Sequence, residues 1–310
     1  KDENIIEGET FEKNEVDVSG IDIFARVLPH QKLLIVEAWQ KKGEVVAMTG
    51  DGVNDAPALM RADIGIALGS GTEVAKEASD LILLDNNFST IIAAIEEGRT
   101  IIDNVRKVVT FLLATGFTEV ILIGGALFMG LPMPILPAHI LWINLVGEGF
   151  FNFAFAFEEK EKDALTRKPT RGVLFTNEMK TLIIIVGLVS DIFLLAIFAW
   201  LLRAGLPMDT IRTIMFAGLA ADSFFFVFSI RSMRRPIWKI DFFSNPYLLF
   251  AVSASALLLL PAVLFPPLQQ LIHTVPLALG QWGIVLALGV VDLFFIEAVK
   301  YYFIARKRTD

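Results

Sequence analysis

The chain has 310 residues, of which 55% are hydrophobic and only 20% are charged, and its mean hydropathy is +0.61. Ordinary soluble domains are less apolar and more charged, so we expect segments that span a membrane. The net charge of −7 leaves no basic stripe for phosphates, which argues against a nucleic-acid partner, and the absence of cysteine excludes disulfides and thiolate chemistry.

The first hundred residues alternate β-branched runs with helical stretches. Predicted strands cover residues 21–27, 45–48, 64–68 and 81–84, and predicted helices cover 29–41, 55 onward, 70–79 and 88 onward. This alternation predicts a parallel sheet covered on both faces, in which ligands bind at the carboxyl ends of the strands. Residues 1–20 show no pattern and the chain starts with Lys, so we expect it to continue a longer protein.

From Val108 onward, apolar runs dominate the chain. We predict six membrane spans, at residues 108–130, 134–157, 181–202, 210–230, 246–265 and 281–304. The loops 158–180 and 231–245 and the tail 306–308 are rich in Lys and Arg, whereas the connections 131–133 and 266–280 have none. The positive-inside rule therefore predicts that the first domain, both basic loops and the C-terminus are cytoplasmic.

The most distinctive polar segment is MTGDGVNDAPAL at residues 48–59, which follows the second predicted strand. Asp51 and Asp55 lie four residues apart in a Gly-rich turn. Mg²⁺ prefers one or two carboxylates with waters and phosphate oxygens, and Gly50 and Gly52 let the backbone approach a ligand closely. A lone pair of aspartates at this spacing is more often a helix cap, with Asp55 capping the helix that follows, so the spacing alone leaves both interpretations open.

The whole string resembles the hinge motif of the P-type ATPases, which are ion pumps built on a haloacid-dehalogenase-like phosphorylation domain. Further matching segments are FARVLP at 24–29, IGIALGSGT at 64–72, DNNFSTI at 85–91 and LWINLV at 141–146. The resemblance, closest to the calcium-pump subgroup, covers nearly the whole chain. It implies an α/β haloacid-dehalogenase-like (Rossmann-like) partial domain at residues 1–100 and an all-α six-helix transmembrane bundle at 101–310, matching family helices five to ten.

The resemblance also implies roles for four residues at the turn. Asp51 is expected to hold Mg²⁺ beside a phosphorylated aspartate, with Asp55 as a further Mg²⁺ contact. Asn54 is expected to support the bound phosphate, and Lys32 to neutralise the phosphoryl group. Phosphoryl transfer depends mainly on positioning and charge stabilisation, which these residue types supply. By its position alone, Lys32 would equally fit a solvated helix face.

Several family features are missing from the sequence. It contains no D-K-T-G-T motif, which carries the phosphorylated aspartate, and no T-G-E-S loop or nucleotide-binding domain. We therefore expect the chain to be the C-terminal third of a pump whose N-terminal two-thirds complete the protein. The whole pump is expected to use ATP and Mg²⁺, whereas these residues alone are predicted not to hydrolyse ATP.

Ionisable groups inside a bilayer cost ~2.5–3.5 kcal/mol on insertion scales, so they are usually functional. Glu119 lies in the first predicted span and Asp222 in the fourth. Asn144 and Glu148 lie in the second, four residues apart and so on one α-helical face. By resemblance to the calcium pumps, these four residues are expected to bind the transported cation, with Ca²⁺ as the expected ion. A structural cluster that holds helices together is the alternative.

The intramembrane pattern also departs from the family. Gly116 and Gly147 stand where calcium pumps have side-chain oxygens, so we expect one ion rather than two, and proton transport stays open. Asp191, Asp292 and Glu297 are interpreted as structural, with Lys300 as the partner of Glu297.

Other functions remain open at this stage. They are a pump for protons or another divalent cation, a membrane-anchored phosphatase of the haloacid-dehalogenase type, and a non-catalytic membrane scaffold. The missing nucleophile and the intramembrane carboxylates argue against the phosphatase. For a pump, the helix that begins at Phe88 is expected to run without a break into the first span and so to couple the two domains.

Overall fold

The computed structural model describes residues 4–10, 18–161, 163–167 and 174–305. The chain divides into two compact units, Lys1–Ile95 and Glu96–Asp310. The boundary falls inside helix α4 (Phe88–Phe128), which is one continuous helix of 41 residues, as the sequence predicts.

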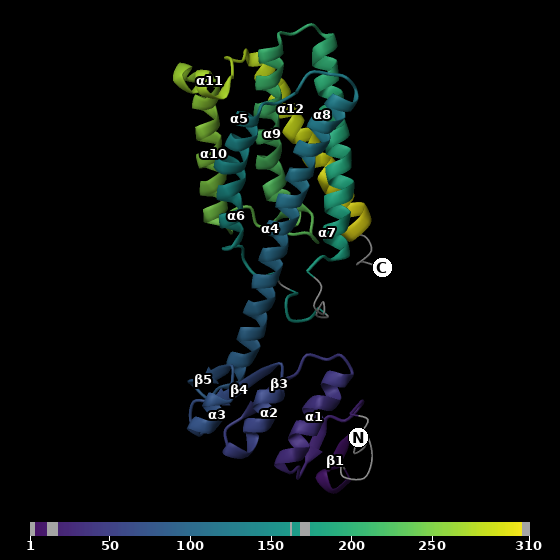
Figure 1. The fold of residues 1–310 in the computed structure, drawn as a ribbon, viewed down its shortest axis with the longest axis vertical. Coiled ribbons are helices and arrows are strands. Elements are labelled where there is room, and N and C mark those ends of the chain that lie inside the picture. The colour runs from purple at the N-terminus through teal and green to yellow at the C-terminus, as the bar shows by residue number, and fades with distance from the viewer. Residues whose placement is uncertain (1–3, 11–17, 162, 168–173, 306–310) are drawn as a thin grey trace. The chain divides into compact units, whose positions relative to one another are not determined.

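The first unit is an α/β fold with two small parallel sheets (Figure 1). One sheet has the order β3 (Ala47–Gly50), β4 (Ile64–Leu68), β5 (Leu81–Leu83), and the other pairs β1 (Ile5–Glu7) with β2 (Ile23–Ala25). The helical elements are η1 (Gly8–Thr10), α1 (Pro29–Lys41), η2 (Val53–Asp55), α2 (Ala56–Arg61) and α3 (Glu73–Glu77). A small core of Leu59, Ala67 and Ala75 lies between the sheet and its helices.

Strands β2 and β5 are shorter than predicted, at Ile23–Ala25 and Leu81–Leu83, and two further strands differ more from the sequence prediction. β3 starts two residues later than expected because it pairs in register with β4, Ala47 opposite Ile64, which leaves Val45 before the strand and 70% exposed. β1 lies in a stretch where the sequence shows no pattern, since three residues are too short for an alternation to be recognised.

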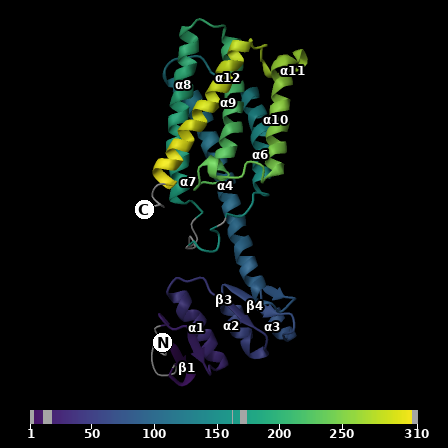
Figure 2. The same cartoon turned by 180° about the vertical axis from the view of Figure 1, so that it is seen from behind.

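The second unit is all-helical (Figures 1 and 2). After α4, its helices are α5 (Pro137–Trp142), α6 (Gly149–Phe155), α7 (Asn177–Thr181), α8 (Gly187–Arg203), α9 (Met208–Ile230), α10 (Pro246–Leu264), α11 (Pro266–Ile272) and α12 (Leu279–Val299). Between or beyond them lie the π-helical segments η3 (Ile143–Glu148), η4 (Leu182–Val186) and η6 (Lys300–Ala305), and the 3₁₀ turn η5 (Ile237–Lys239).

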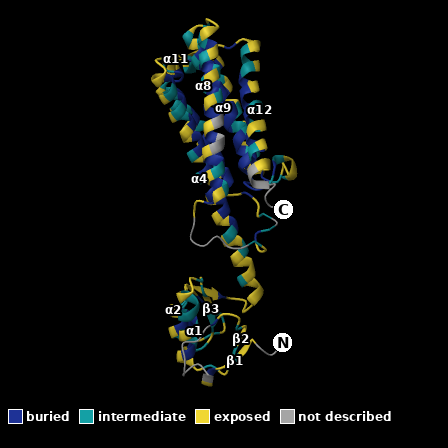
Figure 3. Cartoon of the chain, turned by 90° about the vertical axis from the view of Figure 1, so that its right-hand side faces the viewer, coloured by how far each residue is buried: buried dark blue, intermediate teal, exposed yellow. Residues whose placement is uncertain are grey.

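Within the described residues, four helices are long and apolar enough to cross a membrane. They are Phe88–Phe128, Met208–Ile230, Pro246–Leu264 and Leu279–Tyr302, and they contain four of the predicted spans almost entirely. The predicted spans 134–157 and 181–202 are helical too, but η3 and η4 interrupt them, so no single α-helix covers either. The N-terminal part of α4 is mostly exposed, and its buried residues begin at Thr100 (Figure 3).

Helix α9 is the most enclosed of these four helices, with 78% of its apolar window buried. It packs closely against α12 through glycines. A Cβ atom on Gly218 would approach Leu288 Cδ1 to 2.7 Å, and one on Gly289 would collide with the Phe225 ring. Small residues of this kind let helix backbones approach closely in a membrane.

Buried ion pairs join the two basic loops at one end of the bundle. Arg231 and Glu158 lie 2.9 Å apart with side chains 2% and 5% exposed, and Asn245 donates a second hydrogen bond to Glu158 at 2.8 Å. Asp103 on α4 pairs with Arg167. Several basic residues that predict the orientation are therefore paired with acidic residues. The orientation also rests on Lys162, Lys168, Arg171 and the basic tail 306–308, which lie outside the described residues.

The expected partner of Glu297 is confirmed. Lys300 Nζ lies 2.9 Å from Glu297 Oε1, and Lys300 is 1% exposed. Glu297 also accepts hydrogen bonds from the Ser229 hydroxyl and, at 2.8 Å, from the backbone N–H of Ile237. These contacts connect α12 to α9 and to the loop that follows α9.

Candidate functional site

The Gly-rich turn in the first unit is built around the carboxylate of Asp55. The backbone N–H groups of Asp51 and Gly52 donate to Asp55 Oδ2 at 3.3 Å each. One interpretation of the sequence expected Asp55 to cap α2, but its side chain makes no capping hydrogen bond to that helix. It closes the turn before the helix instead. A Cβ atom on Gly50 would lie 2.6 Å from Asp55 Cβ, so only glycine fits there.

Lys32 on α1 pairs with the same carboxylate. Its Nζ lies 2.6 Å from Asp55 Oδ1, and Asp55 is only 7% exposed. Burial alone would raise the pKa of Asp55, but the hydrogen bond from Lys32 and the backbone N–H groups outweigh it, so the pKa lies below its ordinary value of 3.8. Both oxygens of Asp55 are therefore engaged.

Asp51 and Asn54, by contrast, are exposed. The main chain of Asp51 is fixed because its carbonyl accepts a hydrogen bond from Thr72 N–H at 2.8 Å. Within the described residues, no group of three His, Cys, Asp or Glu side chains could hold a metal ion. Mg²⁺ needs only one or two protein carboxylates beside waters and phosphate, so the exposed Asp51 fits it. Asp55 would have to release Lys32 to become a direct ligand.

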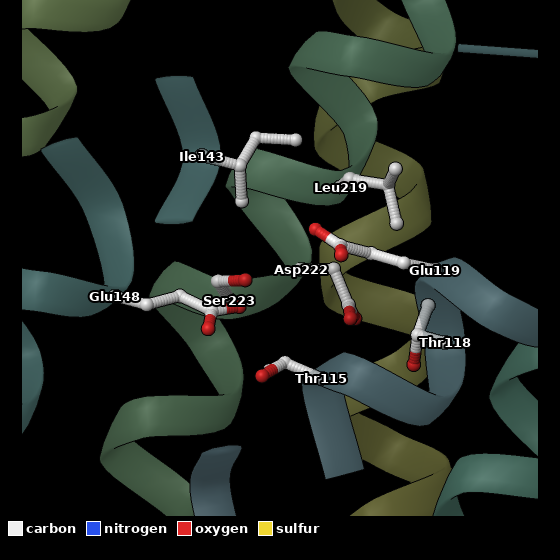
Figure 4. A pocket seen from close by; sticks show the side chains of 8 residues that line it. All are labelled: Thr115, Thr118, Glu119, Ile143, Glu148, Leu219, Asp222 and Ser223. Carbon is white, nitrogen blue, oxygen red and sulfur yellow. The ribbon is translucent and has the colours of Figure 1, made fainter. Parts of the chain in front are cut away.

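A small polar cavity lies among the membrane helices (Figure 4). Its lining residues come from α4, η3 and α9 and are Thr115, Thr118, Glu119, Ile143, Glu148, Leu219, Asp222 and Ser223. The volume open to the centre of a water-sized sphere is about 10 Å³, enough for about one such body. Three predicted cation ligands, Glu119, Glu148 and Asp222, thus share one cavity.

Two carboxylate oxygens at this cavity are available to a ligand. Within the described part of the chain, Glu119 Oε1 and Asp222 Oδ1 are buried and accept no hydrogen bond. Asp222 is 9% exposed and Glu148 is 6% exposed. Buried oxygens without donors favour a bound cation or proton, because an isolated negative charge is poorly solvated in an apolar surrounding.

The fourth predicted ligand, Asn144, is exposed and does not line the cavity, although its side chain is hydrogen-bonded to Glu119. Asn144 and Glu148 lie in the π-helical segment η3, so the α-helical spacing on which their predicted shared face rests does not apply there, and of the two only Glu148 lines the cavity. A π-helical segment forms its backbone hydrogen bonds between residues five apart, and the residues of η3 that line the cavity are Ile143 and Glu148.

Further polar residues lie near the cavity that the sequence did not assign to it. Asp191, which is fully buried, and Asp292 are both within electrostatic reach of Asp222. They come from α8 and α12, and no spacing in the sequence connects residues on separate helices. Thr115 was also missed, although it lies one helical turn before Glu119, a spacing that could have revealed it.

The two units define the class of protein. A parallel α/β unit with an Asp-rich turn at a strand end is continuous with apolar helices that enclose carboxylates. In comparisons with protein families, residues 132–302 match the family described as cation transporting ATPase, C-terminus, and residues 8–63 match haloacid dehalogenase-like hydrolase. The chain belongs to the cation-transporting ATPase family and is an integral membrane protein.

Curated relatives carry matching names. The chain is 40% identical over 283 residues to the "Calcium-transporting ATPase" of Bacillus subtilis, covering 90% of this chain and 32% of the relative. It is 41% identical over 270 residues to the "Probable cation-transporting ATPase F" of Mycobacterium tuberculosis, covering 86% and 30%. It is 35% identical over 291 residues to the "Calcium-transporting ATPase 1" of Yarrowia lipolytica, covering 93% and 31%. The chain therefore spans about a third of the length of these relatives.

Proposed function

We propose that the chain is the C-terminal part of a P-type pump that moves a cation, Ca²⁺ in our proposal, out of the cytosol in an ATP-driven aspartyl-phosphate cycle. Residues 1–100 belong to the phosphorylation domain and 101–310 to the transmembrane domain. The observation that carries the proposal is the intramembrane cavity lined by Glu119, Glu148 and Asp222, in a chain of this family.

At the soluble turn, the exposed carboxylate of Asp51 binds Mg²⁺, which when bound neutralises charge on the phosphoryl group. Asp55 holds the turn through two backbone N–H groups and holds Lys32 beside it. Lys32 can exchange this ion pair for the phosphoryl group, and Asn54 supports the phosphate. ATP itself is bound by parts of the pump that precede this segment.

The ion is chosen by oxygen ligands. Carboxylates suit a hard cation such as Ca²⁺, and relatives named calcium-transporting support the same ion. A cavity of about one water-sized body supports a single ion, as do Gly116 and Gly147, which bring no side-chain oxygen. The second candidate is a pump for protons or another divalent cation, which the abundance of carboxylates also supports.

We infer a topology of six membrane helices, of which the second and third are interrupted by the π-helical segments η3 and η4. The long helix α4 joins the phosphorylation domain to the first span and carries Glu119, so it is the direct route by which phosphorylation changes the cavity. The first domain, the two basic loops and the C-terminus lie in the cytoplasm.

The test compares variants of the full-length pump. Glu119→Gln and Glu148→Gln should each raise the Ca²⁺ concentration for half-maximal ATPase activity at least tenfold, because each removes a charged ligand from a poorly solvated ion. The matched control is Asp209→Asn on α9, because the Asp209 side chain is 71% exposed. This variant should leave the Ca²⁺ concentration for half-maximal ATPase activity unchanged.

The outcomes separate the candidates. If the Ca²⁺ concentration for half-maximal ATPase activity changes by the same small amount in all three variants, the shared cation site is rejected and a structural cluster of polar residues is favoured. A proton pump would need no metal ion besides Mg²⁺, and each Gln variant would instead shift the pH profile of its activity.

A further inference from the structure

The π-helical segment η3 holds the part of the cavity that belongs to the second predicted span. In it, the backbone N–H of Gly149 donates to the carbonyl of Asn144, five residues earlier, in place of the usual four. This register sets which residues face the cavity and which do not. The direction of Glu148 therefore depends on whether η3 keeps its π-helical form.

A hydroxyl from a neighbouring helix contacts the middle of this segment. Ser255 on α10 donates from Oγ to the carbonyl of Val146 at 2.7 Å, and Ser255 is only 2% exposed. Val146 lies between Asn144 and Glu148 in the chain. Apart from Ser255 and a few other polar positions, helix α10 is strongly apolar. It contributes no residue to the lining of the carboxylate-lined cavity.

A second small cavity adjoins η3. It is lined by residues of η3, α9 and α10, including Val146, Gly147 and Ser255. Ile143 of η3 and Ser223 of α9 line both this cavity and the carboxylate-lined one, so η3 forms part of the wall between them. Without a fixed contact, η3 could change its hydrogen-bond register and turn Glu148 away from the carboxylate-lined cavity.

We propose that Ser255 is a positioning residue, which holds the π-helical form of η3 through the Val146 carbonyl and so keeps Glu148 directed into the cation cavity. Backbone carbonyls inside a bilayer need a hydrogen-bond donor, and π-helical segments commonly occur at functional sites. The inference rests on the proposed function, because it assigns Glu148 to cation binding.

The test uses the full-length pump, with Ca²⁺ as the probe. Ser255→Ala should raise the Ca²⁺ concentration for half-maximal phosphorylation by ATP about tenfold, while the maximal phosphoenzyme level and the KM for ATP stay unchanged. Ser255→Thr, which keeps the hydroxyl, should restore the wild-type value. Ser253→Ala is the matched control, since Ser253 lies on the same helix but is exposed.

A second measurement does not depend on activity. Hydrogen exchange of peptides that contain η3 should be faster in Ser255→Ala than in wild type, and unchanged in Ser253→Ala. If Ser255→Ala does not fold, Ser255→Cys replaces it, because a thiol is similar in size but a much weaker donor.

Three results would be decisive. Wild-type Ca²⁺ dependence and wild-type exchange in Ser255→Ala would overturn the inference while leaving the proposed pump intact. The same change in Ser253→Ala would overturn it as well, because the effect would then be general to α10. If the wild-type pump shows no Ca²⁺ dependence, the proposed ion fails, and the exchange measurement still decides whether Ser255 holds η3.

Discussion

Among single residues, Asp55 and Lys32 show how a buried carboxylate can organise a turn. We predict that Lys32→Met lowers the local stability of this region by about 1–3 kcal/mol, because it leaves a buried carboxylate without its partner. Hydrogen exchange of peptides containing α1 and η2 in the full-length protein would measure this opening free energy.

The loss of local stability in Lys32→Met should depend on pH. Because the pKa of Asp55 is lower in the folded protein than in the unfolded chain, its contribution is present above the unfolded pKa and is lost as the pH falls through the folded pKa. The difference between wild type and Lys32→Met should thus be full at pH 7 and shrink below about pH 4. A difference that stays constant down to pH 3 would show that Lys32 acts through packing alone.

Asp51 is predicted to act in chemistry rather than in folding. In the full-length pump, Asp51→Asn should abolish Mg²⁺-dependent phosphoenzyme formation, since an amide cannot replace a carboxylate at a hard cation. Asp51 is exposed, so the fold should be unaffected. Glu73→Gln, at a side chain that is 83% exposed on α3, is the control. Phosphoenzyme at the wild-type level in Asp51→Asn would refute the assignment.

Much of the candidate site could be anticipated from residue types, because carboxylates in apolar runs stand out at once. Glu119, Glu148 and Asp222 are examples. Asn144 could not be placed correctly, since its direction depends on the π-helical register. The proximity of Asp191 and Asp292 to Asp222 could not be foreseen either, because it depends on how three separate helices pack.

Among the elements, local signals decided which boundaries were predictable. Helix α1 and strand β4 have the predicted bounds, Pro29–Lys41 and Ile64–Leu68, because a proline starts one and a short apolar run defines the other. Strand β3 was displaced because pairing with β4 sets its register. Segments η3 and η4 leave no mark in hydropathy, so apolar runs predicted unbroken spans there.

The buried pair of Glu158 and Arg231 should be important for the stability of the bundle. Glu158→Gln is predicted to cost about 3–5 kcal/mol, since it leaves a buried guanidinium without its counter-charge. Thermal unfolding in detergent would show a lower midpoint. Glu159→Gln, at the exposed neighbouring position, should leave the midpoint unchanged. Equal midpoints for both variants would mean that the pair is not needed for stability.

For the whole molecule, the missing motifs lead to a simple prediction. The 310 residues alone should show no Mg²⁺-dependent ATP turnover, because they contain no D-K-T-G-T motif to accept the phosphoryl group. A phosphate-release assay on the purified chain, with the full-length pump as the positive control, would measure this. Steady turnover by the chain alone would mean that another residue serves as nucleophile.

The close packing of α9 on α12 has a consequence for how an ion could leave the cavity. Gly218 and Gly289 bring the two helices so close that an added Cβ atom at either position would collide with the facing helix. In the proposed cation site, we therefore expect Asp222 to keep its position, because α9 is packed closely on α12, while Glu119 on α4 and Glu148 on η3 lie on elements outside this packed pair. We expect the ion to be released when Glu119 and Glu148 move away from Asp222, so that the ligands on only one side of the cation change position.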